Sequence, residues 1–237
     1  MHVVMLAYPG MTQLDLTGPF EVLARFPELN LHLAWKDVAP VADGNGLRIV
    51  PSTSFDEAPA ADIVFVPGGP GQLALMDDAE TLSFLRRQAM GARLVTSVCT
   101  GSLVLGAAGL LQGYRATCHW LSLSQLAILG AIPVADRVVV DRNRVTGAGV
   151  TSGIDFGLTL AAQLFGEERA QLVQLGMEYD PQPPFAGGSP HSANPAHVAQ
   201  LTAQLGPFQQ ARLAAAHRAA AMLAGRDLGM GPGSGPG

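Results

Sequence analysis

The segment around Cys99 has the residue order of a catalytic turn. A strand-like run at residues 93–98 ends at Cys99, and Thr100-Gly101-Ser102 opens a helix-like run. This order predicts a nucleophile elbow, a sharp strand-to-helix turn that presents its side chain at the carboxyl edge of a sheet. Because a helix N-terminus favours a thiolate, we expect Cys99 to be reactive, with a lowered pKa. A buried, inert cysteine is the alternative, and the turn context favours the reactive thiol.

A second candidate, Asp15, lies between Leu14 and Leu16 and between the first predicted strand and the first predicted helix. Its carboxylate could simply accept backbone N–H groups at the helix entrance. It could instead exchange a proton with a nearby thiol, its pKa raised by burial and by a like charge. The residues alone leave both roles open.

Gly68 and Gly69 follow a strand-like run at residues 62–67 and begin a glycine-proline loop. Such a loop can aim free backbone N–H groups into a site, although a tight turn that needs positive φ would have the same composition. The loop lacks the G-x-G-x-x-G spacing and the lysine of a phosphate-binding loop. These absences argue against nicotinamide, flavin and nucleotide cofactors.

His119, in Thr117-Cys118-His119-Trp120, is the only histidine between predicted core elements. Cysteine hydrolases need a base, so His119 is a candidate, and we favour a structural or site-lining role for it. The other five histidines show no ligand spacing, and the sequence contains neither H-E-x-x-H nor paired C-x-x-C. We therefore expect no metal site and no cofactor. Ser152 falls one place too late for G-x-S-x-G, which disfavours serine catalysis.

The elements around these residues alternate in the manner of βαβ units. Short apolar runs and longer amphipathic segments predict a mostly parallel sheet covered by helices on both faces. The first helix is expected to begin at Gly18, with Pro19 in its first turn. A hairpin or edge addition to the sheet is expected at residues 138–146. Strands are predicted at residues 2–8, 30–35, 62–67 and 92–98, and helices at residues 18–26, 79–90, 100–108, 120–129, 152–165 and 167–177.

The C-terminal part is rich in alanine and predicts two helices, at residues 195–205 and 208–223, packed on the core or on a second subunit. The last residues are rich in glycine, proline and serine and are expected to be disordered. The sequence thus predicts an α/β domain at residues 1–190, a helical extension at 191–226 and a disordered tail at 227–237.

The overall composition sets limits on location and partners. With 237 residues, 48% of them hydrophobic, one domain with a substantial core is expected. The net charge of −5 provides no cationic surface for nucleic acid or anionic lipid. The chain shows no secretory signal and no membrane-spanning apolar stretch. Two cysteines cannot form a disulfide framework, so we expect a cytoplasmic protein.

Several motifs together resemble the ThiJ/PfpI superfamily of class I glutamine-amidotransferase-like proteins, and within it the bacterial isocyanide hydratases. The resemblance implies a flavodoxin-like three-layer α/β/α sandwich and a homodimer. It extends from the first strand to about Ser189. The motifs that carry it are Leu14-Asp15-Leu16-Thr17-Gly18-Pro19, Val66-Pro67-Gly68-Gly69, Thr96-Ser97-Val98-Cys99-Thr100-Gly101-Ser102, Ala116-Thr117-Cys118-His119-Trp120 and, after Glu178-Tyr179, Phe185-Ala186-Gly187-Gly188-Ser189-Pro190.

The resemblance also implies a reaction, the addition of water to an isocyanide to give an N-substituted formamide. Cys99 would attack the isocyanide carbon to form a thioimidate, and Asp15 would move the protons. Thr100 would stabilise developing charge through its N–H and hydroxyl, and Gly69 would supply a second N–H. Gly68 and His119 would line the substrate site. Many relatives with other activities carry glutamate at the position of Asp15, so the aspartate favours the hydratase branch.

Two alternatives remain. Another cysteine enzyme of the superfamily, such as an amidohydrolase, would pair Cys99 with His119. The motif at Asp15 and the cysteine turn also occur in sensor domains of AraC-type transcription regulators, which carry two C-terminal helix-turn-helix units. The residues after Ser189 leave little room for such units, and the acidic balance disfavours DNA binding.

Overall fold

The centre of the protein is a seven-stranded sheet with strand order β10-β11-β7-β6-β1-β2-β5. The computed structural model describes residues 1–229. All neighbouring strands of this sheet are parallel except β10 and β11, which form the expected hairpin at one edge. The strands are β1 (His2–Leu6), β2 (Asn30–Trp35), β5 (Thr53–Ser54), β6 (Ile63–Val66), β7 (Leu94–Val98), β10 (Val138–Asp141) and β11 (Arg144–Gly147). The predicted mostly parallel sheet is confirmed.

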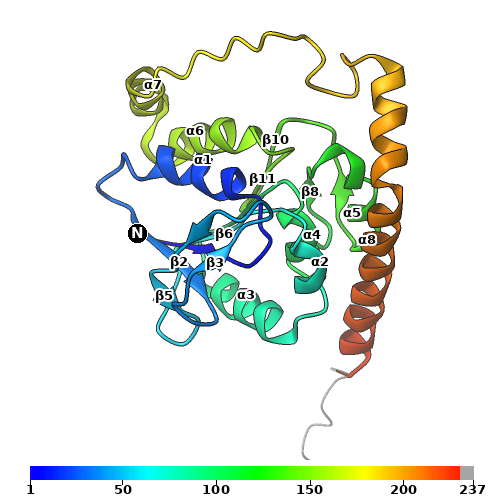
Figure 1. Ribbon diagram of the computed structural model, residues 1–237. Helices are drawn as coiled ribbons and strands as arrows, with labels where there is room; N and C mark the ends of the chain where they lie inside the picture. Colours follow the sequence, from blue (N-terminus) through cyan, green and yellow to red (C-terminus); the bar gives the residue numbers. More distant parts are fainter. Residues whose placement is uncertain (230–237) are drawn as a thin grey trace, which may run out of the picture.

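Helices cover both faces of this sheet (Figure 1), which gives the expected three layers. On one face α1 packs against α6, and α7 packs on α6; on the other lie α2, α3 and α4. Every residue of β6 is buried, as parallel strands between two helical layers require. The helices are α1 (Gln13–Leu23), α2 (Gln72–Leu75), α3 (Ala79–Gly91), α4 (Gly101–Ala107), α6 (Ser152–Phe165) and α7 (Glu167–Gly176).

The start of α1 differs from the sequence prediction. The helix begins at Gln13 rather than Gly18, and Pro19 lies inside it. Packing against α6 explains why the proline is tolerated: Pro19 is buried against Gly153, where a Cβ would lie 3.0 Å from the proline ring. The earlier start places Asp15 in the first turn of α1, with its backbone fixed by the helix.

The helix predicted at residues 120–129 is broken in two. A 3₁₀ turn, η1 (Trp120–Ser122), precedes the short helix α5 (Gln125–Ile128). The His119 side chain accepts the N–H of Leu121, which satisfies the start of the tighter turn. Five two-residue strands are too short for a sequence pattern. They are β5 at the edge of the central sheet and two separate pairs, β3 (Val41–Ala42) with β4 (Arg48–Ile49) and β8 (Arg115–Ala116) with β9 (Ile132–Pro133).

The C-terminal segment forms one long helix, α8 (Pro195–Gly229), in place of the two predicted. It continues through Pro207 and packs along the edge of the core against α4 and α5 (Figure 1). Its alanines at 215, 216 and 219 are fully buried, so the half of the helix after the proline is packed on the core. The helix continues through residues 227–229, the first residues of the predicted disordered tail, so that part of the prediction is wrong. The rest of the predicted tail, residues 230–237, lies outside the described residues.

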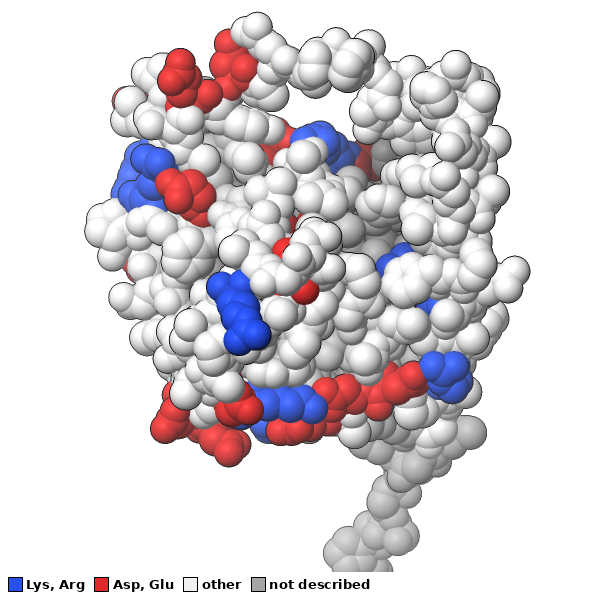
Figure 2. Space-filling view, in the orientation of Figure 1, with Lys and Arg blue, Asp and Glu red and all other residues white. Residues whose placement is uncertain are grey.

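The surface shows neighbouring charges of both signs rather than a field of one sign. On the face shown in Figure 2, acidic and basic side chains alternate along the lower rim, and most of the area above is uncharged. Pairs such as Lys36 with Asp78 and Arg218 with Asp77 neutralise each other. Within residues 1–229, no helix combines the length and the apolarity that crossing a membrane requires.

Candidate active site

The predicted site segments meet at one edge of the sheet. The chain leaves β1 toward β2 on one side and returns to β6 on the other, so a crevice opens at the carboxyl ends of β1 and β6. Asp15 follows β1, Gly68 follows β6, and Cys99 follows the neighbouring strand β7. Strand order therefore brings together residues that lie far apart in the sequence.

Cys99 occupies the predicted elbow. Its φ of 57° is in the left-handed region, which is uncommon for a residue with a side chain and typical of a strained catalytic turn. Its N–H donates to the carbonyls of Gly147 (3.0 Å) and Ala148 (2.7 Å), which fix the turn. At Gly101 a Cβ would lie 2.1 Å from the Val66 carbonyl oxygen, so only glycine lets α4 pass this close to β6.

Asp15 lies against the thiol and is completely buried. Its Oδ2 accepts the N–H of Gly68 at 2.9 Å. Its Oδ1 is buried and makes no hydrogen bond with the described residues, which leaves this oxygen available to the Cys99 proton. A Cβ at Gly68 would lie 2.8 Å from Oδ2, so the glycine is needed for this contact.

Burial changes the pKa of both groups in the same direction. Desolvation raises the pKa of Asp15 to about 7, although contacts with the Cys99 thiol and the Gly68 N–H oppose the rise. Desolvation, and then the charge of Asp15, raise the pKa of Cys99 well above its ordinary value, and the N–H of Thr100 opposes this only in part. The predicted lowering of the Cys99 pKa is therefore wrong, because burial outweighs the N-terminus of a seven-residue helix.

Cys99 is therefore a neutral thiol before substrate binds, and it needs a base to remove its proton. At neutral pH Asp15 is close to half ionised, and its carboxylate is the nearest group that can accept the thiol proton. A carboxyl with a pKa near the working pH is suited to both accept and return a proton.

The backbone N–H groups of the glycine loop donate to side chains of the protein rather than to a ligand. The Gly68 N–H is used by Asp15, and the Gly69 N–H donates to Oγ1 of Thr100 at 3.0 Å. The expectation that these two N–H groups are free for a substrate is therefore wrong, because both hold site residues in place. The Thr100 N–H faces the Cys99 sulfur, as expected for a group that stabilises charge there.

A cavity of about 200 Å³ lies over Cys99. Residues from the core form its floor, and side chains of α8 form its outer wall. His119 and Gly69 line this cavity, whereas Gly68, which was expected to line the site, does not. The lining residues are Thr12, Gly69, Pro70, Cys99, Thr100, His119, Leu121, Val150, Leu205, Phe208, Gln209 and Arg212.

Arg212 projects from α8 into this cavity and was not predicted as a site residue from the sequence. Its side chain is 5% exposed and forms no ion pair with a carboxylate among residues 1–229. Its Nε donates to Gln72 and its Nη1 to Ser122, both at 2.8 Å. A signal was present: Arg212 shares a helix face with the buried alanines, so its guanidinium had to enter the core.

His119 lines the cavity over Cys99 as an uncharged side chain. Burial, and then the charge of Arg212, lower its pKa. Its Nδ1 accepts the N–H of Leu121 at 3.4 Å, which leaves the ring proton on Nε2. A histidine with a lowered pKa is a weak base for the thiol proton, and the groups that perturb the Cys99 pKa do not include it. Among residues 1–229, no group of three or more metal-binding side chains comes together.

The chain belongs to the DJ-1/PfpI family, which residues 1–163 match. It is 53% identical over 223 residues to the isonitrile hydratase of Pseudomonas putida, across 94% of this chain and 98% of that protein. A solved ThiJ/PfpI family protein from Pseudomonas syringae superposes with a TM-score of 0.89 at 45% identity and covers 91% of this chain and 90% of that one.

More distant matches mark the breadth of the family. Drosophila melanogaster DJ-1beta superposes with a TM-score of 0.66 at 26% identity, across 75% of this chain and 97% of that one. The transcriptional regulator GbdR of Pseudomonas aeruginosa is 37% identical over 151 residues, which are 63% of this chain and only 41% of the regulator. The described residues after 190 contain the single helix α8 and no helix-turn-helix pair.

Proposed function

We propose that this protein is a hydro-lyase that adds water to an isocyanide (isonitrile) and releases an N-substituted formamide. The observation that carries the proposal is the buried pair of Cys99 and Asp15, in which Oδ1 of the carboxyl is left without another partner. The similarity to an isonitrile hydratase over nearly the whole of both chains supports the same reaction.

In the first half of the reaction, the Asp15 carboxylate takes the proton from the Cys99 thiol. The sulfur electron pair forms a bond to the terminal isocyanide carbon, and that carbon then takes the proton from Asp15. The product is a thioimidate, R–N=CH–S–Cys99, which contains every atom of the isocyanide. The Thr100 N–H at the sulfur stabilises negative charge while it is present there.

In the second half, Asp15 takes a proton from water as the water oxygen adds to the thioimidate carbon, and it passes that proton to the nitrogen. The tetrahedral intermediate then breaks its C–S bond. Its hydroxyl proton moves by way of Asp15 to the departing sulfur, which restores the thiol and releases R–NH–CHO. A pKa of about 7 lets Asp15 act as base and acid in turn.

The experiment follows formamide production from a simple isocyanide by proton NMR. The native protein should give formamide, and Cys99→Ala should give none above the uncatalysed background while keeping its circular dichroism spectrum. Cys118→Ala, which removes the other free cysteine, should remain active. Equal rates in the native and Cys99→Ala proteins would reject the proposal.

We further propose that the enzyme works in the cytoplasm as a homodimer, without metal or cofactor. The apolar side chains of Leu172 and Leu175 on α7 support the dimer, since they are 63% and 78% exposed in the single chain. Light scattering during size-exclusion chromatography should give twice the chain mass of 24.6 kDa. A single-chain mass at micromolar concentration would contradict it.

A further inference from the structure

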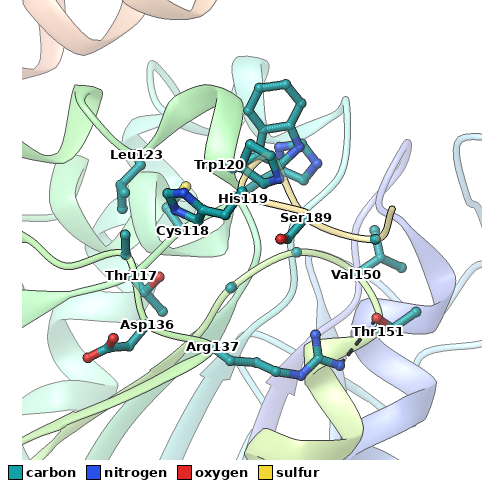
Figure 3. Close-up of a pocket in the computed structure, with 16 residues that line it drawn as sticks. Thr117, Cys118, His119, Trp120, Leu123, Asp136, Arg137, Val150, Thr151 and Ser189 are labelled. Carbon is teal, nitrogen blue, oxygen red and sulfur yellow. Dashed lines mark hydrogen bonds between the residues drawn. The ribbon is translucent and has the colours of Figure 1, made fainter. Parts of the chain in front are cut away.

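A second and larger cavity, of about 540 Å³, lies next to the cavity over Cys99. The two share His119 and Val150 as lining residues, so these side chains form the boundary between them. We call the larger space the outer chamber. Figure 3 shows His119 and Trp120 along one side of it, with Arg137 and Thr151 on the opposite side.

The segment between α7 and α8 forms one wall of the outer chamber. It contributes Gly188, Ser189 and Pro190 of the Gly-Gly-Ser-Pro motif, and also His191, which follows the motif. The proposed reaction chemistry does not use this motif. A local turn gives this wall a defined shape: Oγ of Ser189 lies 3.0 Å from Oγ of Ser192, and the Ala193 N–H donates to the Ser189 carbonyl at 2.8 Å. Figures 1 and 2 show the segment arching over the body of the molecule.

The chemistry of the chamber suits an uncharged, apolar group. The Arg137 guanidinium is paired with Asp155 and also donates to Thr151, so most of its charge is already compensated. The acidic side chain of Asp136 also lines the chamber and disfavours an anion there. Trp120 and Val150 offer apolar surface, and an aromatic ring suits stacking against an indole.

The volumes of the two cavities indicate which part of a substrate each can hold. A typical small-molecule site has a volume of about 300–1,000 Å³. The cavity over Cys99, at about 200 Å³, holds little more than the reacting group, whereas the outer chamber falls within that range. A free isocyanide is linear at its C–N–R unit, so a molecule whose terminal carbon approaches the Cys99 sulfur carries its substituent away from the sulfur. The outer chamber adjoins the cavity over Cys99 at His119 and Val150 and can hold a substituent that the smaller cavity cannot.

We propose that the outer chamber binds the N-substituent of the substrate, and that the natural substrates are isocyanides with a bulky, uncharged aromatic substituent. This inference rests on the proposed hydratase function. It assigns a role to the Gly-Gly-Ser-Pro wall and to Trp120, neither of which touches the reacting atoms in the mechanism above.

The test compares kcat/KM for 2-naphthyl isocyanide with kcat/KM for methyl isocyanide. The native protein should favour the naphthyl compound. Ser189→Trp, which places an indole in the outer chamber, should lower the naphthyl-to-methyl ratio by about tenfold. Ala186→Trp is the matched control, because it adds the same side chain to the same exposed segment at a position that does not line the chamber, and it should leave the ratio unchanged.

Binding of the product N-(2-naphthyl)formamide provides a second readout that needs no turnover. Equilibrium dialysis should show binding about tenfold weaker for Ser189→Trp than for native protein or Ala186→Trp. A native preference for methyl isocyanide, or a ratio that Ser189→Trp does not change, overturns the inference while the hydratase function stands. If the native protein hydrates neither isocyanide, the proposed function fails and the inference fails with it.

Discussion

Replacing Asp15 with asparagine should abolish activity and stabilise the fold, and the stabilisation should depend on pH. The Asp15 carboxyl has a pKa of about 7 in the folded protein and an ordinary value of 3.8. Between these values the folded chain binds a proton that the unfolded chain has lost. Raising the pH through this window therefore reduces stability, and the reduction is complete above pH 7.

The size of the effect follows from the pKa difference. At about 1.4 kcal/mol per pH unit, the burial of the Asp15 carboxylate costs on the order of 4 kcal/mol at pH 8 and about 1–2 kcal/mol at pH 5. Asparagine has nearly the same shape, cannot ionise, and can still accept the Gly68 N–H through its amide oxygen. Asp15→Asn should therefore be more stable than the native protein by roughly these amounts at the two pH values.

Urea unfolding at pH 5 and at pH 8 measures this difference. Asp56→Asn is the control, since Asp56 is exposed and its substitution should change stability little at either pH. An Asp15→Asn protein that is no more stable at pH 8 than the native chain would refute the reasoning. A gain of the same size at both pH values would show that burial of the charge is not its cause.

Three further predictions concern the same site. The kcat/KM for an isocyanide should rise about tenfold per pH unit below pH 7 and level off above it, because Asp15 must be ionised to accept the thiol proton. If the His119→Asn substitution shifts this pH profile, the histidine rather than Asp15 is the base. Gly101→Ala should lower the free energy of unfolding by at least about 2 kcal/mol, because the new Cβ would overlap the Val66 carbonyl oxygen. A urea midpoint equal to that of the native protein would contradict this prediction. Arg212→Met should slow thiol alkylation and turnover about tenfold, because it removes a buried positive charge from the cavity that contains the Cys99 sulfur. Unchanged rates would assign Arg212 a purely structural role.

The sequence was most informative where a local pattern determines the outcome. The apolar runs predicted β2 and the hairpin of β10 and β11, and the small residues after Cys99 predicted the elbow. Asp15 and Cys99 were both expected where a strand leads into a helix, and the parallel sheet brings these two connections to one edge. In these cases the backbone conformation follows from residues that are neighbours in the chain.

Other features depend on contacts between distant segments, and sequence patterns missed them. The proline inside α1 is tolerated because α6 presents a glycine to it. The pKa of Cys99 is raised because several layers of the fold exclude water from it, whereas the sequence shows only the favourable helix N-terminus. Gly68 and Gly69 looked like donors to a ligand because their acceptors, Asp15 and Thr100, lie far away in the chain.

The most direct test of the central claim is the mass of the Cys99 peptide in protein quenched with acid during turnover. Addition of the thiol across the isocyanide carbon retains every atom of the substrate. The peptide that contains Cys99 should therefore become heavier by the mass of one isocyanide, and the peptide that contains Cys118 should not. An adduct on a different residue, or formamide release by a Cys99→Ser protein at the native rate, would contradict the account.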